Sequence, residues 1–156
     1  MTRAAWRVEA ADPASPDAAR LMAELSAVLA AITGDSGQSS FDPDDVRGPL
    51  ARFAVARGAD GAAAGCAALR PLEQGVAEIK RMYARPGHAG CGSAVLAFLE
   101  SEAAALGYGV LRLSTRRVNT RAVAFYAARG YAPIPNFGRY AAKPESVCFE
   151  KRLRRV

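Results

Sequence analysis

The sequence has few residues that could build a metal site or a disulfide framework. It contains three cysteines, Cys66, Cys91 and Cys148, and its one histidine is His88. The cysteines are odd in number, lie far apart and form no paired C-x-x-C spacing, so we expect neither a structural zinc site nor disulfide bonds. The fold should therefore be stabilised by a hydrophobic core, and we expect the function to need no metal ion.

Long hydrophobic runs are absent as well. Residues 1–13 contain no apolar stretch of signal-peptide length, and the most apolar segment, residues 62–69, is far too short to span a bilayer. We therefore expect a cytoplasmic protein that has no membrane partner.

The sequence also lacks the basic surface that nucleic acids need. The formal net charge is +6, but residues 151–156 contain four basic residues and no acidic one. These charges form a solvated tail and not a basic face interleaved with aromatic residues or an amphipathic basic helix. No nucleic-acid partner is expected.

The composition that remains is typical of one globular domain, residues 1–156. The chain is 51% hydrophobic and 23% charged, which is enough to bury a core. Apolar periodicity and turn residues predict helices over 17–32, from the glycine-rich segment to Gly107, and from Asn119 to Gly130. The same signals predict strands over 5–12, 51–58, 62–72, 76–85, 110–116, 131–134 and 146–153. This order predicts an α/β fold with a mixed sheet and helices on both faces.

A glycine-rich segment, residues 85–94 ("RPGHAGCGSA"), comes directly before the second predicted helix. The start of a helix carries unpaired backbone N–H groups and a partial positive charge, so small residues there let a phosphate approach the backbone. A tight turn between a strand and a helix needs the same residues. Both interpretations fit the segment by itself.

Charged residues interrupt the strand predicted over 76–85. Glu78, Lys80 and Arg81 stand where a central strand should be apolar. Glu78 and Lys80 could pair, because residues two apart point to the same side of a strand. Alternatively, Glu78 lines a cleft and takes a proton there.

The third predicted helix carries a candidate acid. Asn119, Ala122 and Tyr126 are spaced by three and four residues and share one face, whereas Phe125 points elsewhere. Tyr126 could donate a proton to a leaving thiolate, or it could simply pack in the core.

These features together resemble the GNAT superfamily of acyl-CoA-dependent N-acyltransferases. The resemblance covers about residues 50–153 and rests on the segment "AGCGSA", the strand before it and the pattern N-x-x-A-x-x-x-Y of residues 119–126. It implies a mostly antiparallel sheet of six to seven strands. It also implies a first strand, helix and acceptor loop over 1–50, an acetyl-CoA-binding core over 51–130, and closing strands with a basic tail over 131–156.

The resemblance also implies which residues contact acetyl-CoA, the co-substrate. Met82, Tyr83 and Ala84 match the stretch that pairs with pantetheine, and Asn119, Ala122 and Tyr126 match the cofactor-contacting helix face. The phosphate loop corresponds to His88, Ala89, Gly90, Cys91, Gly92, Ser93 and Ala94. The family usually has Arg or Gln where this chain has Ala89, so binding would depend on backbone amides, with Arg85 as a candidate aid. Cys91 could act as a nucleophile at a helix N-terminus, but the resemblance places it beside phosphate, where it and His88 are inert.

The implied reaction transfers the acetyl group directly to a primary amine in a ternary complex. Tyr126 would be the acid for the CoA thiolate, and Glu78, directly or through water, the base for the amine. The alternative is a non-catalytic acyl-CoA-binding module of the same fold. A dinucleotide-binding oxidoreductase fits less well, because the strand over 110–116 ends in arginine and not in an acidic residue.

The acceptor is a small molecule or a peptide that the sequence does not identify. The long polar loop over 33–49 carries Asp35 and Phe41, and its acidic residues could attract a cationic amine. Arg139, in the second long loop, could instead hold a carboxylate. We expect Asp35, Phe41 and Arg139 to lie in two loops that form the walls of the acceptor site. The sequence is also compatible with a homodimer.

Overall fold

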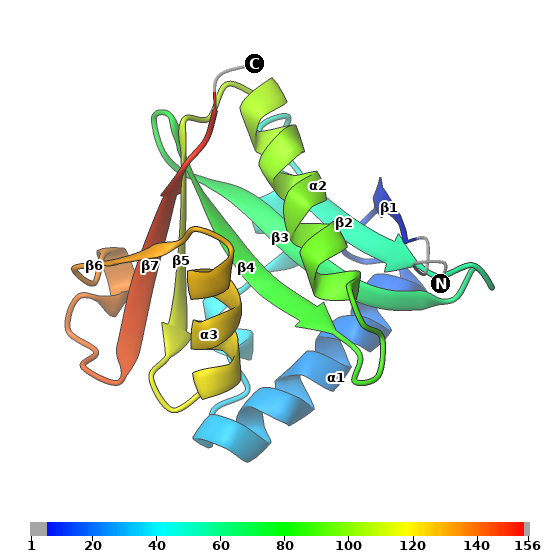
Figure 1. The fold of residues 1–156 in the computed structure, drawn as a ribbon, viewed down its shortest axis with the longest axis horizontal. Coiled ribbons are helices and arrows are strands. Elements are labelled where there is room, and N and C mark those ends of the chain that lie inside the picture. The colour runs from blue at the N-terminus through cyan, green and yellow to red at the C-terminus, as the bar shows by residue number, and fades with distance from the viewer. Residues whose placement is uncertain (1–5, 155–156) are drawn as a thin grey trace.

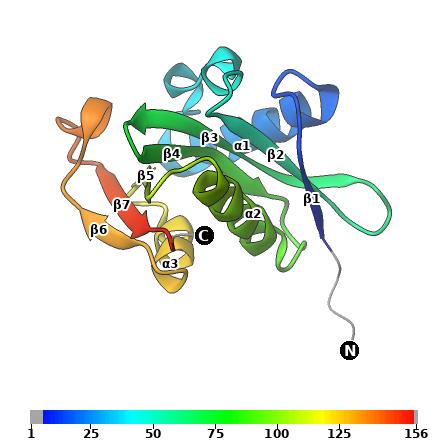
Figure 2. The same ribbon diagram turned by 90° about the horizontal axis from the view of Figure 1, so that it is seen from above.

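The protein folds into one twisted sheet with helices on both faces (Figures 1 and 2). The computed structural model describes residues 6–154, so Ala5 of the first predicted strand and Arg155 of the basic tail lie outside the described residues. The helices are α1 (Pro16–Thr33), α2 (Cys91–Ala105) and α3 (Thr120–Ala128). The strands are β1 (Arg7–Ala10), β2 (Arg52–Arg57), β3 (Ala63–Glu73), β4 (Val76–Ala84), β5 (Val110–Arg116), β6 (Ala132–Ile134) and β7 (Ser146–Arg152).

The sheet has the strand order β1-β2-β3-β4-β5-β7-β6. All neighbouring strands are antiparallel except β4 and β5, which are parallel and joined by α2. Helix α1 covers one face, and α2 and α3 cover the other (Figure 2). The predicted mixed, mostly antiparallel sheet with helices on both faces is confirmed.

Local sequence signals explain where the helices begin and end. The Ser15 hydroxyl accepts a hydrogen bond from the amide of Ala18, Pro16 opens α1, and Gly34 ends it in a left-handed conformation. The Asn119 side chain caps α3 by accepting from the amide of Ala122. The loop over 33–49 contains two short 3₁₀ helices, Gln38–Ser40 and Pro43–Val46.

Two apolar cores lie on opposite faces of the sheet. Leu96, Leu99, Leu111, Leu113 and Phe149 belong to the core beneath α2 and α3. The core beneath α1 contains Leu21, Leu25, Phe53, Val55 and Cys66. Because both faces are covered, the central strands are buried on both sides, and charged residues in β4 need partners or a cavity.

Strands β4 and β5 separate after their first residues. They pair only through Val76–Glu78 and Val110–Arg112 among the described residues, and beyond that point they diverge (Figure 1). Strand β4 also bulges, since Arg81 and Met82 together lie opposite the single residue Ala67 of β3. The gap between the parallel strands positions the cavity described next.

Candidate functional site

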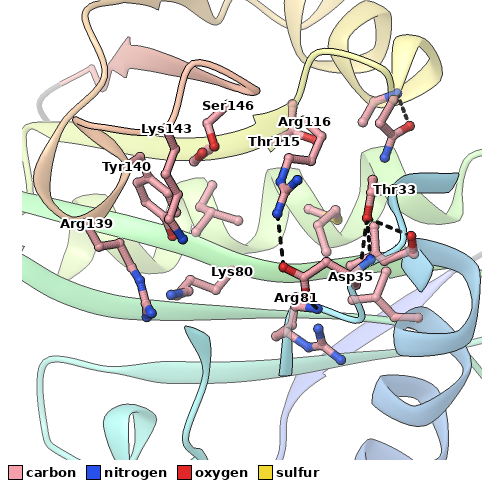
Figure 3. A pocket seen from close by; sticks show the side chains of 18 of the residues that line it. Thr33, Asp35, Lys80, Arg81, Thr115, Arg116, Arg139, Tyr140, Lys143 and Ser146 are labelled. Atoms are coloured by element: carbon pink, nitrogen blue, oxygen red, sulfur yellow. Dashed lines mark hydrogen bonds and ion pairs between the residues drawn. The ribbon is translucent and has the colours of Figure 1, made fainter. Parts of the chain in front are cut away.

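A cavity of about 200 Å³ lies where β4 and β5 diverge (Figure 3). Helix α1 and its following loop form one side, β4 and β5 form the floor, and α3 and the loop between β6 and β7 complete it. The lining residues are Leu25, Leu29, Thr33, Asp35, Gly37, Ser39, Ile79, Lys80, Arg81, Met82, Ser114, Thr115, Arg116, Asn119, Ala122, Tyr126, Arg139, Tyr140, Lys143 and Ser146. The cavity lies at the carboxyl ends of two parallel strands, the usual place for a ligand in such sheets.

The bulge in β4 places Arg81 in an uncommon conformation beneath α1. Its φ is 55°, in the left-handed region that non-glycine residues rarely adopt. The guanidinium donates 2.9 Å to the carbonyl of Met22 and 3.2 Å to that of Ser36, and also to the hydroxyl of Ser26. Its Nε has no hydrogen-bond partner, and burial lowers the pKa of this side chain. Arg81 therefore connects the first helix and its loop to the floor of the cavity.

Glu78 lies behind the cavity wall and is not one of the lining residues. Its side chain is 2% exposed, forms an ion pair with Arg70 on β3, and accepts a 3.0 Å hydrogen bond from the hydroxyl of Tyr140. Tyr140 itself lines the cavity, so a lining hydroxyl connects Glu78 to it. The predicted role of Glu78 as a base stays a prediction, and a direct contact with substrate would require Tyr140 to move.

Lys80 lies on the same side of β4 as Glu78 and faces the cavity (Figure 3). Its ammonium group lies 6.0 Å from the centre of the Tyr140 ring. Burial lowers the pKa of Lys80, attraction to Glu78 raises it, and repulsion from Arg70 and Arg139 lowers it further. This part of the cavity therefore concentrates positive charge.

The predicted face of α3 does line the cavity. Asn119, Ala122 and Tyr126 are all lining residues. The Tyr126 ring packs edge-on against Phe125 and Tyr131, and burial raises the pKa of Tyr126, which keeps its hydroxyl protonated at neutral pH. That hydroxyl makes no hydrogen bond to any residue in the described part of the chain. The Tyr126 ring thus packs in the core, while its hydroxyl has no hydrogen-bond partner among the described residues.

The glycine-rich segment forms the turn that starts α2. Gly90 precedes the helix in a left-handed conformation with a φ of 82°, and the first-turn amides of Gly92 and Ser93 make no backbone hydrogen bond within residues 6–154. The indole of Trp6 donates 3.1 Å to the carbonyl of Ala89, which fixes the loop to the first strand. His88 is exposed beside Trp6, at a ring-centroid distance of 5.9 Å. The amides of the first turn are thus free to bind an anion.

Two arginines near this loop have defined partners. Arg85 forms a two-point ion pair with Glu24 of α1, at 2.9 and 2.7 Å, so it is held toward α1. Arg129, at the end of α3, donates 2.9 Å to the Ser93 hydroxyl and lies 3.8 Å over the Phe125 ring. The cation that contacts the first turn of α2 is therefore Arg129, to which no motif in the sequence pointed.

The last residues of β4 alternate between the two faces of the sheet. Met82 and Ala84 pack toward α2, and Met82 lines the cavity. Tyr83 belongs to the core beneath α1, and its hydroxyl donates 3.1 Å to Glu24. Of the three residues, Met82 is the one that faces the gap between β4 and β5.

Cys91 is the first residue of α2 and is completely buried. Burial raises the pKa of its thiol to about 11, so it remains protonated at neutral pH. Its environment is that of a packed apolar side chain and does not favour a nucleophile.

The three predicted acceptor residues lie in different places. Asp35 and Arg139 both line the cavity, and Asp35 forms a 3.0 Å ion pair with Arg116 of β5. Phe41 lines a separate depression that it shares with Met22, Ser26 and Arg81. The two long loops thus meet at one cavity, but Phe41 is outside it.

No pattern in the sequence pointed to Tyr140, Lys143 or Trp6. Tyr140 and Lys143 lie in the second polar loop, which carried no motif except Arg139. The one available signal for Tyr140 was its position directly after Arg139. Trp6 is the one tryptophan of the sequence, and its bond to Ala89 joins residues 83 positions apart, which no local pattern predicts.

Among the described residues, no group of three or more His, Cys, Asp and Glu side chains could hold a metal ion. In the same part of the chain, no helix is both long enough and apolar enough to cross a membrane.

Comparisons with known proteins point to one family. The model of the acetyltransferase (GNAT) family matches residues 20–131. An IAA acetyltransferase of Azospirillum brasilense is 33% identical over 137 residues, covering 86% of this chain and 89% of that protein. A Klebsiella pneumoniae protein described as an acyl-CoA N-acyltransferase superposes with a TM-score of 0.81 at 29% identity, covering 96% of this chain and 98% of that one.

A second similar structure contains ligands. N-acetylglutamate synthase from Neisseria gonorrhoeae, complexed with coenzyme A and N-acetylglutamate, superposes with a TM-score of 0.71 at 20% identity. The match covers 99% of this chain and 36% of that larger one, and it concerns the fold. The family match, the identity to the Azospirillum protein and the shared sheet agree, and the chain belongs to the GNAT family of acetyltransferases.

Proposed function

We propose that the protein transfers an acetyl group from acetyl-CoA directly to a primary amine, with both substrates bound in the cavity between β4 and β5. The observation that carries this proposal is the position of Tyr126, which lines that cavity and whose hydroxyl has no hydrogen-bond partner among the described residues. The diverging strands leave the backbone around Met82 without a strand partner on the β5 side. An acyl-pantetheine chain could lie along this edge.

The pyrophosphate of acetyl-CoA would lie against the start of α2. The amides of Gly92 and Ser93 are open there, and the helix dipole favours an anion. Arg129, which bonds to Ser93, supplies a positive charge that partly replaces the arginine or glutamine expected in place of Ala89. Arg85, which directly follows β4, is paired with Glu24 and so holds the end of β4 against α1.

The chemistry follows from the residues around the cavity. The amine nitrogen attacks the thioester carbonyl, whose oxygen becomes negative and accepts from a backbone N–H of Met82 or a neighbour. When the carbon–sulfur bond breaks, Tyr126 donates its proton to the thiolate. The excess proton on the new amide nitrogen leaves to solvent, and the Tyr126 phenolate takes a proton back from solvent. The raised pKa of Tyr126 keeps that proton in place until the thiolate forms.

The amine must lose a proton before it attacks, because a lysine-like amine has a pKa of about 10.4 in water. The contact of Tyr140 with Glu78 supports a two-step transfer. The Tyr140 oxygen accepts the proton of the ammonium group while its own proton moves along the 3.0 Å hydrogen bond to Glu78. Glu78 thus acts through a residue that lines the cavity.

Direct transfer is tested by mixing the enzyme with acetyl-CoA alone, and then with amines, while following CoA thiol release and the intact mass of the protein. We expect release only when an amine is present and no acetylated protein at any time. A burst of CoA without amine, accompanied by acetyl-enzyme, would overturn direct transfer. Acetyl-CoA binding with no turnover on any amine would favour the non-catalytic acyl-CoA-binding module. The sequence feature that supports this alternative is Ala89, where the family usually has Arg or Gln.

A further inference from the structure

The cavity wall carries an excess of positive charge. Five cationic side chains line it, namely Lys80, Arg81, Arg116, Arg139 and Lys143. Asp35 is the one carboxylate among the lining residues that the structure describes, and it is already paired with Arg116. A cavity built for a second ammonium group would place free carboxylates here, as opposite charges favour binding.

The bulge in β4 creates this arrangement. In a regular strand Lys80 and Arg81 would point to opposite faces, but the extra residue lets both lie on the face beneath α1. Figure 3 shows Lys80 and Arg139 side by side, and the charge of Arg139 contributes to lowering the pKa of Lys80. Two cations that repel each other in the absence of ligand would be stabilised by an anion between them.

Arg81 adds a buried charge that no carboxylate neutralises. It is 9% exposed, and its hydrogen-bond acceptors are two carbonyls and one hydroxyl, while its Nε has none. A buried cation that is not paired is costly, so the region gains from a negative charge nearby.

We propose that the acceptor is a small amine that also carries an anionic group, a carboxylate or a phosphate, which Lys80 and Arg139 bind. This inference rests on the proposed acetyl transfer and names the class of its acceptor. Arg81 lies beneath the bound anion and contributes through its charge.

Of the acidic residues in the loop over 33–49, Asp35 lines the cavity and is paired with Arg116, whereas Asp45 attracts Lys80 without lining the cavity. Asp42 accepts from the amide of Asp44, and Asp44 forms an ion pair with Arg47, all on the exposed surface. None of these three residues lines the cavity. The earlier alternative of a cationic amine attracted by this loop therefore has less support than an anionic acceptor.

The test is a panel of acceptors assayed with acetyl-CoA by CoA thiol release. The panel contains the common amino acids, the carboxamide of each, O-phosphoethanolamine, putrescine and spermidine. We expect turnover with at least one anionic amine, and a kcat/KM at least about tenfold lower when that acid is replaced by its amide. O-phosphoethanolamine distinguishes a phosphate from a carboxylate.

Two variants connect the preference to the proposed residues. Arg139→Gln, at an exposed position, should raise the KM for the anionic acceptor about 10- to 100-fold, leave kcat within a few-fold, and abolish the preference over the amide. Lys80→Gln should act in the same direction. Arg154→Gln removes one exposed charge from the terminal tail and should change none of these values.

The inference is overturned if amides or diamines are acetylated as fast as acids, if no anionic amine is acetylated, or if Arg139→Gln leaves the preference unchanged. The melting temperature with acetyl-CoA alone shows whether the proposed transferase fails as well. A stabilised protein that acetylates only diamines would retain the transferase and contradict the anionic acceptor.

Discussion

The hydroxyl of Tyr140 donates a 3.0 Å hydrogen bond to Oε2 of Glu78, and this bond joins the cavity to a carboxylate behind its wall. Arg70 holds the other oxygen of the same carboxylate. Burial, with the nearby negative charge of Glu78, raises the pKa of Tyr140, so this hydroxyl is neutral and can pass on a proton. Tyr140 is accordingly a proposed proton carrier in the wall of the cavity.

Replacing Tyr140 by phenylalanine should lower kcat about 10- to 100-fold at pH 7, because the amine then loses its route to Glu78. The rate of the variant should rise steeply with pH, since amine that is already deprotonated in solution needs no carrier. The pH profile of CoA release checks this. Tyr108→Phe, which removes a hydroxyl bonded to the carbonyl of Leu50 outside the cavity, is the matched control. A Tyr140→Phe profile parallel to that of the unmodified enzyme would contradict the proton transfer.

Tyr126→Phe should lower kcat about 100-fold or more while the KM for acetyl-CoA changes little, because the hydroxyl acts on the leaving thiolate. Tyr131→Phe serves as control, since its hydroxyl is also buried but bonds to Glu100 away from the cavity. Steady-state kinetics of both variants give the kcat and the KM for acetyl-CoA that are compared. Equal turnover in the two would remove Tyr126 from the mechanism.

Gly65 of β3 lets the start of α2 approach the sheet closely. A Cβ at this position would lie 2.6 Å from the sulfur of Cys91 and 2.9 Å from the carbonyl oxygen of Tyr83. Gly65→Ala should therefore lower the free energy of unfolding by about 1–3 kcal/mol through overpacking. Thermal denaturation measures the change, with Gly48→Ala, which meets no atom within 4 Å, as control. If the two variants melt together, α2 is not packed against β3 in this way.

The ion pair of Glu24 with Arg85 should make stability depend on pH. The hydrogen bond from Arg85, followed by that from Tyr83, lowers the pKa of Glu24 below its usual value of 4.5. A carboxyl whose pKa is lower in the folded state contributes stability above its unfolded pKa and loses it as the pH falls through the folded one. Glu24→Gln should thus cost about 1 kcal/mol or less at pH 7 and less at pH 3 than at pH 7.

Melting curves of Glu24→Gln between pH 3 and 7 check this dependence. Glu145→Gln, at an exposed position, provides the comparison and should differ from the unmodified protein at neither pH. A Glu24→Gln deficit as large at pH 3 as at pH 7 would mean that packing of the side chain, and not its charge, stabilises the contact between α1 and β4.

The secondary structure and sheet type could be predicted because their signals are local. Ser15 and Pro16 mark the start of α1, and Asn119 marks that of α3, each through its own backbone. The position of Tyr126 in the cavity wall also followed, since helix spacing alone places it with Asn119.

The partners of the charged residues in β4 could not be predicted, because they depend on register and on loops. Glu78 pairs with Arg70 because the two lie opposite each other in β3 and β4, eight residues apart in the chain. The bulge that turns Arg81 toward α1 follows from one extra residue in β4, which only the pairing with β3 reveals. The contact of Tyr140 joins residues 62 positions apart through a loop without periodicity.

The central claim, that acetyl-CoA is the co-substrate, is tested most directly by the melting temperature in saturating acetyl-CoA, with NAD and ATP as controls. A ligand at about a hundred times its Kd adds about 2.7 kcal/mol, which corresponds to a rise of about 5–10 °C for a chain of this size. We expect that rise with acetyl-CoA and none with NAD or ATP. No rise with acetyl-CoA, or an equal rise with NAD, would contradict the claim.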